Sequence, residues 1–193
     1  FSLTSPTGTT VYPERLRTTW SHSISDDLVH WQELPTALYP GEGDEPDASG
    51  VWTGSVICGE GQYHAFYTGY CLTAEFQQTI CHATSDDGIT WTKDIANPVI
   101  TPMTDPYVFY NEEDENYWIL ISARRLDMPV TRRGCIVLYR SKNLKDWTYY
   151  GPIYSPGHTN CPECPEMYKM GGHWYLSYSR FSEFVNTIYR VSE

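Results

Sequence analysis

The chain has 193 residues, enough for a domain with a sizeable core, and its net charge is −11. This charge argues against nucleic acid or an anionic membrane surface as a partner, and no apolar run is long enough to span a bilayer. Sixteen Tyr and seven Trp, with 14 Gly and 13 Pro, favour short strands joined by tight turns. They also suit a carbohydrate partner, whose apolar faces stack on rings.

A repeat runs through the chain. Residues 25–31, 85–91 and 141–147 each read Ser, a polar pair, a short turn and a Trp, about 55 to 60 positions apart. A short alternating run that predicts a strand comes before each copy. These runs are residues 20–24, 79–83 and 135–139.

A second repeat interleaves with the first. Gly-rich or acidic turns separate paired β-like runs, which predicts three hairpins. The hairpins span residues 53–68, 105–122 and 163–178. Four antiparallel strands in each period are typical of a β-propeller blade, whereas a β-sandwich would not explain a repeat of this length. No segment predicts a convincing helix.

The repeats give the expected domain organisation, a single partial β-propeller domain over residues 1–193. Its blades are part of blade one (1–40), blade two (52–101), blade three (104–153) and part of blade four (161–193). A closed ring needs about four to eight blades, so we expect strands to be missing at both ends and the chain to belong to something longer.

Two carboxylates are candidates for chemistry. The first strand of each blade lines the central channel, and the blade register puts residues 53–55, Asp105 and Glu163 at equivalent positions. Two carboxylates that converge near Trp and Tyr are the minimum apparatus for glycoside hydrolysis. The alternative is that they are solvated or capping groups, as most Asp and Glu are.

Several motifs resemble glycoside hydrolase family 32, the invertases, inulinases, levanases and sucrose-6-phosphate hydrolases. The set, in chain order, is SDDLVHW (25–31), LPTALYP (34–40), WTGS (52–55), YTG (67–69), NPVI (97–100), DP (105–106) and ECPE (163–166). The first motif also occurs in related five-bladed families that act on arabinose and xylose polymers. The resemblance implies an all-β, five-bladed β-propeller and a retaining β-fructofuranosidase.

The resemblance also implies roles for single residues. Glu163 corresponds to the general acid/base and Asp105 to the transition-state stabiliser. Thr53 and Ser55 would lie around the fructosyl subsite, and Trp52 would line it. The family's nucleophile is an Asp in an Asn-Asp-Pro-Asn-Gly motif that this sequence lacks. We therefore expect the chain to begin just past that motif and not to perform the reaction alone.

Two positions depart from the family pattern. Thr104 stands where the family has an Arg that contacts the bound sugar, and Thr cannot supply a planar guanidinium fork. Arg124 or Arg125, at the end of the next predicted strand, could substitute. Glu166 replaces the usual Asp and keeps the carboxylate.

No cofactor or metal is expected. The Cys161–Cys164 spacing resembles a metal motif, but no second Cys pair follows, which favours buried thiols. Six Cys form no dense disulfide framework, and without a glycosylation sequon or signal-peptide pattern the compartment stays open. The acidic stretches 41–50 and 112–115 predict solvated loops, and the three repeated Trp (Trp31, Trp91 and Trp147) predict packing between blades.

The sequence leaves three functions open. The first is hydrolysis of sucrose, sucrose-6-phosphate or a fructan. The others are a non-catalytic carbohydrate-binding propeller and a related hydrolase acting on arabinosyl or galactosyl substrates. It does not settle the fructoside, the balance between hydrolysis and transfer, or the oligomeric state.

Overall fold

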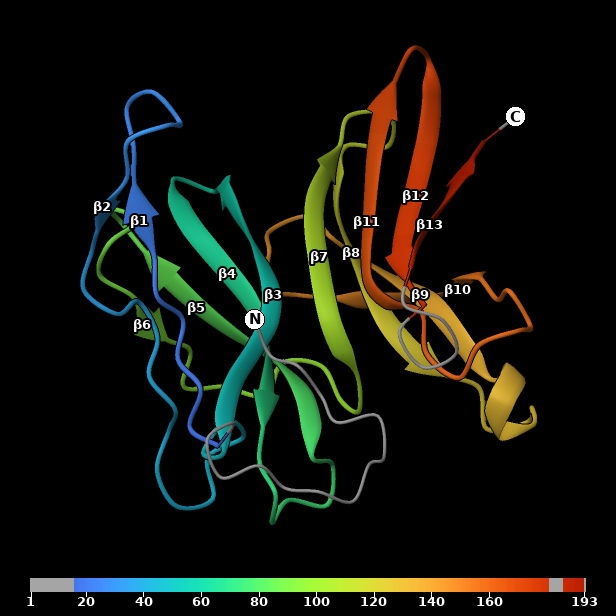
Figure 1. The fold of residues 1–193 in the computed structure, drawn as a ribbon, viewed down its shortest axis with the longest axis horizontal. Helices are drawn as coiled ribbons and strands as arrows, with labels where there is room; N and C mark the ends of the chain where they lie inside the picture. Colours follow the sequence, from blue (N-terminus) through green and yellow to red (C-terminus); the bar gives the residue numbers. More distant parts are fainter. Residues whose placement is uncertain (1–15, 181–185, 193) are drawn as a thin grey trace.

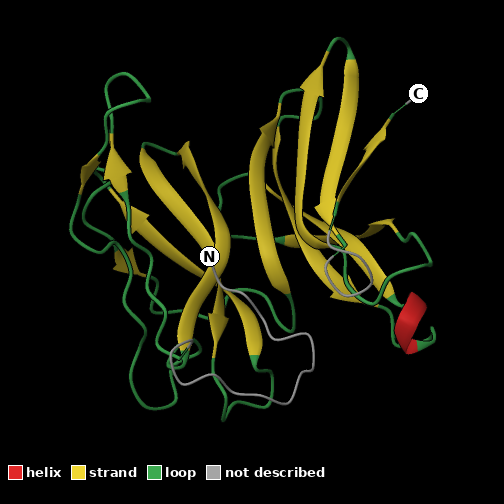
Figure 2. Cartoon of the chain, in the orientation of Figure 1, coloured by secondary structure: helices red, strands yellow, loops and turns green. Residues whose placement is uncertain are grey.

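The computed structural model describes residues 16–180 and 186–192, and this part of the chain is almost entirely β-structure (Figures 1 and 2). Its one helical element is a short 3-10 turn, η2 (Val130–Arg132). The prediction of an all-β fold is therefore confirmed. None of the described segments forms a helix that could cross a membrane.

Within residues 16–180 and 186–192, the strands form four antiparallel sheets in which each strand pairs with its neighbour in the chain. The first sheet has β1 (Ser23–Ile24) and β2 (Gln32–Glu33). The second has β3 (Gly50–Gly59), β4 (Gln62–Tyr70), β5 (Gln78–Ser85) and β6 (Thr92–Lys93). The third has β7 (Thr104–Asn111), β8 (Asn116–Arg124), β9 (Gly134–Ser141) and β10 (Thr148–Tyr154). The fourth has β11 (Glu163–Met170), β12 (His173–Ser179) and β13 (Thr187–Val191).

The first strands of the last three sheets lie next to one another, with β7 between β3 and β11 (Figure 1). The sheets therefore follow one another with their opening strands turned to a common middle. This arrangement fits blades of a propeller. The blade bounds given above and the count of five blades stay predictions.

The core lies between the sheets. On β8, the side chains of Ile119 and Ile121 pack toward the second sheet, in one cluster with Phe66. Leu120 packs on the opposite face, in a cluster with Leu176 of the fourth sheet. Successive strand residues point to opposite faces, so the unbroken apolar run of β8 buries both. All three β8 residues are fully buried.

The repeated Ser turns are scaffold. In the second copy, the Ser85 hydroxyl accepts the Gly88 N–H at 2.9 Å, and an Asp87 oxygen accepts the Thr90 N–H at 2.7 Å. The first and third copies make the same kind of bonds through their own Ser and Asp or Asn side chains. The second and third turns join the third and fourth strands of a four-stranded sheet, and the first turn joins β1 to β2. Local hydrogen bonding of this type favours such tight turns.

The repeated Trp residues behave differently in each copy. Trp147 meets Phe66 of the second sheet edge-on, with ring centroids 5.3 Å apart, so here packing between sheets is confirmed. Trp91 packs against the cluster that contains Leu38 and Val51. Trp31 belongs to the first described sheet, is 59% exposed and meets no other described sheet, so packing between blades stays a prediction for the first copy.

Candidate active site

Each of β3, β7 and β11 carries a β-bulge near its start. Between the two flanking paired residues, the bulged strand advances three residues while its partner strand advances two. The flanking residues are Val51 and Gly54 on β3, Thr104 and Tyr107 on β7, and Glu163 and Glu166 on β11. Bulges bend a strand and re-aim its side chains, and they are frequent beside active sites.

The bulges shift the alignment of β7 with β11 by one residue from the alignment that the sequence predicted. They make Thr104 equivalent to Glu163, and Asp105 equivalent to Cys164. The prediction that Asp105 and Glu163 hold equivalent positions is therefore wrong. Asp105 and Cys164 also share a left-handed backbone, with φ of 57° and 48°, and each precedes a Pro. Such a conformation costs about 1–3 kcal/mol for a residue other than Gly, so the surrounding contacts must hold it in place.

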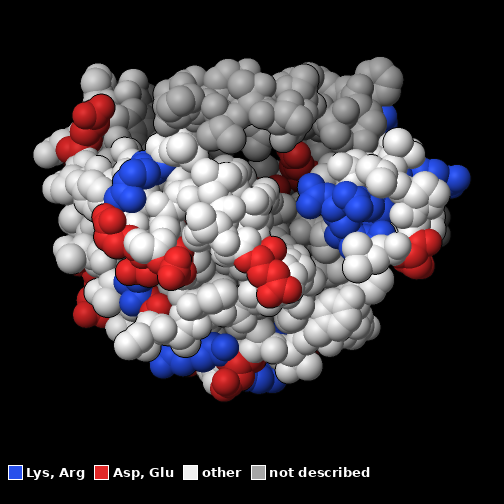
Figure 3. Space-filling view, turned by 90° about the horizontal axis from the view of Figure 1, so that it is seen from below, with Lys and Arg blue, Asp and Glu red and all other residues white. Residues whose placement is uncertain are grey.

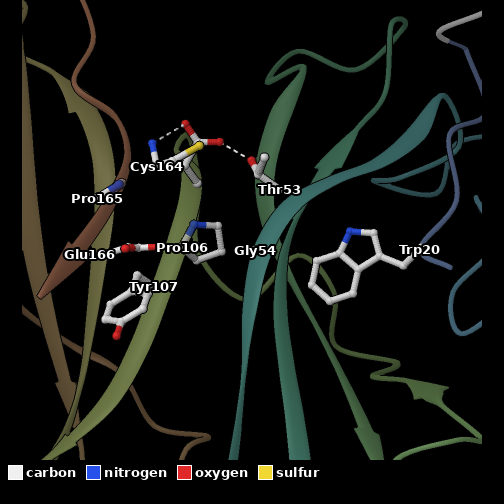
Figure 4. A pocket seen from close by; sticks show the side chains of 9 residues that line it. Trp20, Thr53, Gly54, Pro106, Tyr107, Cys164, Pro165 and Glu166 are labelled. Atoms are coloured by element: carbon white, nitrogen blue, oxygen red, sulfur yellow. Dashed lines mark hydrogen bonds between the residues drawn. The ribbon is translucent and has the colours of Figure 1, made fainter. Parts of the chain in front are cut away.

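Those contacts are visible around Asp105. Its carboxylate accepts a hydrogen bond from the Thr53 hydroxyl of β3 and another, at 3.2 Å, from the Cys164 N–H of β11 (Figure 4). The Thr104 hydroxyl lies 3.2 Å from the same carboxylate, and the Asp105 N–H donates to the Thr68 hydroxyl at 2.8 Å. Donors from both neighbouring sheets thus fix one carboxylate between β3 and β11.

The predicted fructosyl-subsite residues divide into two groups. Thr53 lines the pocket beside Asp105 and bonds to it. The Ser55 hydroxyl instead accepts the Val108 N–H at 2.8 Å and donates to the Pro106 carbonyl at 3.0 Å. It therefore joins β3 to β7 and is engaged with backbone.

Trp52 does not line this pocket. Its ring stacks on Tyr70 with centroids 4.0 Å apart, and its carbonyl accepts the Trp20 indole N–H at 2.7 Å. Trp20 lines the pocket and was missed from the sequence. The only signal was its position in the repeat, where the other two copies begin with Thr79 and Cys135.

The pocket has a volume of about 370 Å³. Figure 4 shows Trp20 on one side and Tyr107, Pro165 and Glu166 on the other, with Thr53 and Gly54 between them. An acidic site walled by aromatic rings suits a sugar, whose hydroxyls need acceptors and whose apolar faces pack on rings.

Glu163 opens β11 opposite Ser179 and is half-buried. Burial, and then the negative charges of Asp105 and Glu163, raise the pKa of the Cys161 thiol to about 12, while Arg124 acts in the opposite direction. The charges of Asp105, Glu163 and Arg124 thus all influence this one buried thiol, whereas Glu163 does not line the pocket with Asp105. A thiol with so high a pKa stays protonated at neutral pH, as expected for a buried structural Cys.

Thr104 and Glu166, the two departures from the family pattern, lie at different cavities. Thr104 is buried, and its hydroxyl lies 3.2 Å from that of Thr68. Arg125 is paired with Asp127 at 2.6 Å, which argues against it as the substitute. Arg124 lines a second cavity, which Thr104 also lines. The carboxylate of Glu166 is retained at the first pocket.

Comparison with known proteins decides the family. The model of the glycosyl hydrolases family 32 N-terminal domain matches residues 8–191. The chain belongs to glycosyl hydrolase family 32. It is 32% identical to a sucrose-6-phosphate hydrolase of Escherichia coli over 83% of this chain and 34% of the relative. It is 33% identical to a levanase of Bacillus subtilis over 78% of this chain and 23% of that relative.

The chain thus spans about a third or less of these relatives. Among solved structures, it resembles a sucrose-6-phosphate hydrolase from Lactobacillus gasseri with a TM-score of 0.77 and 24% identity, over 91% of this chain and 38% of the other. It also resembles fructan 1-exohydrolase IIa from Cichorium intybus, with a TM-score of 0.75 and 24% identity, over 91% and 36%. At this identity the likeness shows the shared fold.

Proposed function

We propose that the protein carrying this chain hydrolyses β-fructofuranosides with retention at the anomeric carbon. The observation that carries this proposal is the Asp105 carboxylate, held at a sugar-sized pocket by Thr53 and the Cys164 N–H. Glu163 lies on the adjacent strand, and its charge acts on the same buried thiol as that of Asp105. The relatives' names, sucrose-6-phosphate hydrolase and levanase, favour fructosides over arabinosyl or galactosyl substrates.

Glu163 acts as the general acid/base. In the first step it gives a proton to the leaving oxygen while the bond from that oxygen to the fructosyl anomeric carbon breaks and a carboxylate bonds to that carbon. In the second step Glu163 removes a proton from water, whose oxygen displaces the carboxylate and releases fructose. The attacking carboxylate is not among the residues assigned here, because the family's Asn-Asp-Pro-Asn-Gly motif does not occur in this sequence.

Asp105 stabilises the oxocarbenium-like transition state. A carboxylate offers about four acceptor positions, and protein donors fill three of them. The remaining acceptor and the negative charge serve the fructosyl hydroxyls and the developing positive charge. Thr53 positions this group, whereas Trp20 and Tyr107 supply the walls. The Trp52 carbonyl accepts the Trp20 indole N–H, and the Ser55 hydroxyl accepts the N–H of Val108, which follows Tyr107 in β7.

The test is turnover of sucrose, inulin and levan by the full-length protein. Glu163→Gln is expected to lower kcat by about 100-fold or more, because general acid–base catalysis contributes roughly 10²–10⁴. Glu113→Gln is the matched control, since Glu113 is exposed and pairs with Lys169 on the surface. NMR of the first-formed fructose should show retained anomeric configuration.

Two results would count against the proposal. Full activity in Glu163→Gln would remove the assigned acid/base. Fructoside binding without turnover in the wild-type protein would favour the carbohydrate-binding propeller instead.

A further inference from the structure

Two buried hydroxyl groups occupy equivalent positions in the second and third sheets. Thr68 on β4 pairs with Ile80 of β5, and Ser122 on β8 pairs with Ile136 of β9. Ile80 and Ile136 each lie five residues before the Ser of a repeated turn, which makes Thr68 and Ser122 equivalent. Both side chains are buried, and a buried hydroxyl needs a hydrogen-bond partner.

The Thr68 hydroxyl holds the start of β7. It accepts the Asp105 N–H at 2.8 Å and lies 3.2 Å from the Thr104 hydroxyl, which donates to the Asp105 carboxylate. A hydroxyl has a single proton, so Thr104 can only accept from Thr68 while it donates to the carboxylate. Three hydrogen bonds therefore form a closed ring, from the Asp105 N–H through Thr68 and Thr104 to the Asp105 carboxylate.

This ring replaces a strand contact that the β-bulge removes. The pairing of β7 with β8 passes from Thr104 directly to Tyr107, so Asp105 has no partner in the ladder. Its left-handed backbone, with φ of 57°, is also strained for a residue other than Gly. Thr68 reaches across from the second sheet and supplies the missing acceptor. The ring thus fixes both the amide and the carboxylate of Asp105.

Ser122 makes the corresponding contact with the fourth sheet. Its hydroxyl donates to the carbonyl of Pro162, which directly precedes Glu163, the first residue of β11. In both cases a buried hydroxyl on the second strand of one sheet holds the backbone where the first strand of the next sheet begins. Asp105 and Glu163, the two candidate catalytic carboxylates, lie at these two points.

We propose that Thr68 and Ser122 are positioning residues for the reaction, Thr68 for the Asp105 carboxylate and Ser122 for that of Glu163. The inference rests on the proposed function. A displacement of about 1 Å at a reacting group can lower the rate about 100-fold. Neither side chain carries a charge, unlike the outer surface, where Figure 3 shows charged atoms of both signs. Their effect on the rate should therefore not depend on salt concentration.

The experiment measures kcat and KM of the full-length protein with sucrose and with levan. Thr68→Val keeps the branched shape and opens the ring, so kcat should fall about 10-fold to 100-fold while KM changes little. Thr68→Ser keeps the hydroxyl and should retain most of the activity. Thr79→Val is the matched control, because Thr79 is buried and its hydroxyl bonds to neither β7 nor β11 in the described residues.

Ser122→Ala tests the second contact. Glu163 is the proposed general acid/base, so its displacement should lower the maximal kcat and also shift the pH profile of kcat. Thr68→Val acts on Asp105 and should lower the maximum without moving the profile. A merely structural role would lower the melting temperature of Ser122→Ala and leave both kcat and the pH profile unchanged, and that result would overturn the assignment of Ser122.

Amide hydrogen exchange separates this inference from the proposed reaction. The Asp105 N–H should exchange at least about 10-fold faster in Thr68→Val than in Thr79→Val, because only the first change removes its acceptor. If no fructoside is hydrolysed but this difference appears, the proposed reaction fails and the Thr68 contact stands. If fructosides are hydrolysed and Thr68→Val matches Thr79→Val in kcat, the positioning role is wrong and the proposed reaction stands.

Discussion

Replacing Thr53 with Val tests whether transition-state stabilisation by the Asp105 carboxylate depends on the hydrogen bond that holds this carboxylate in position. The change keeps the branched shape and removes the hydroxyl that donates to the carboxylate. A hydrogen bond to a charged acceptor contributes about 1.5–3 kcal/mol, which corresponds to roughly 10-fold to 100-fold. Because Thr104 and the Cys164 N–H remain as donors, we expect the lower end, a loss of about 10-fold in kcat/KM.

The assay is steady-state hydrolysis of the best fructoside by the full-length protein, with the melting temperature measured alongside. Thr53→Ser keeps the hydroxyl and should retain most of the activity. The loss in Thr53→Val should fall mainly on kcat, because Asp105 is assigned to the transition state. The reasoning is refuted if the Val variant matches the wild-type protein, or if the Ser variant loses as much as the Val variant.

Three further predictions concern stability. Gly54→Ala would place a Cβ 2.1 Å from a carbonyl oxygen of β4, so we expect a loss of about 1–3 kcal/mol or more in urea unfolding. Burial lowers the pKa of both His64 and His82, which are bonded to each other at 2.9 Å. The unfolded chain therefore binds protons first as the pH falls below about 6.5, and the unfolding free energy should drop there while staying level above pH 7. A flat profile between pH 7.5 and 5.5 would contradict this assignment. Asp47 is buried and its carboxylate lies 2.5 Å from the Lys93 ammonium, so Asp47→Ala should lower the unfolding free energy by about 3–5 kcal/mol. The double variant Asp47→Ala, Lys93→Met should lose less unfolding free energy than the sum of the losses in the two single variants.

The repeated turns could be predicted from the sequence because their hydrogen bonds join residues close together in the chain. The Ser85 and Asp87 side chains bond to backbone N–H groups two or three residues ahead, and the same letters recur near Ser25 and Ser141. The apolar run of β8 was readable for a related reason, since a strand buried on both faces needs no polar alternation. The all-β fold and the antiparallel pairing followed from these patterns.

The sequence predicted less well which residues take equivalent positions at the candidate site and which of them line the pocket. A bulge depends on which residues of two strands pair, and that register is set by packing between segments far apart in the chain. Aligning the acidic residues placed Asp105 beside Glu163, whereas the bulges align Asp105 with Cys164. Likewise, the sequence around Ser55 does not show that its hydroxyl bonds to the Pro106 carbonyl of the next sheet. The sequence around Trp20 does not show that its ring lines the pocket.

The Thr at position 104 removes a cation that the family pattern predicts next to Asp105. A buried Thr104, bonded to Thr68 and to Asp105, leaves no guanidinium beside the proposed fructosyl subsite. Arg124 lines the second cavity, which Thr104 also lines. It follows that Thr104→Arg, which returns a planar guanidinium to the fructosyl side, should lower KM for fructosides in the full-length protein. An unchanged KM in steady-state kinetics would show that the fructosyl subsite gains nothing from that cation.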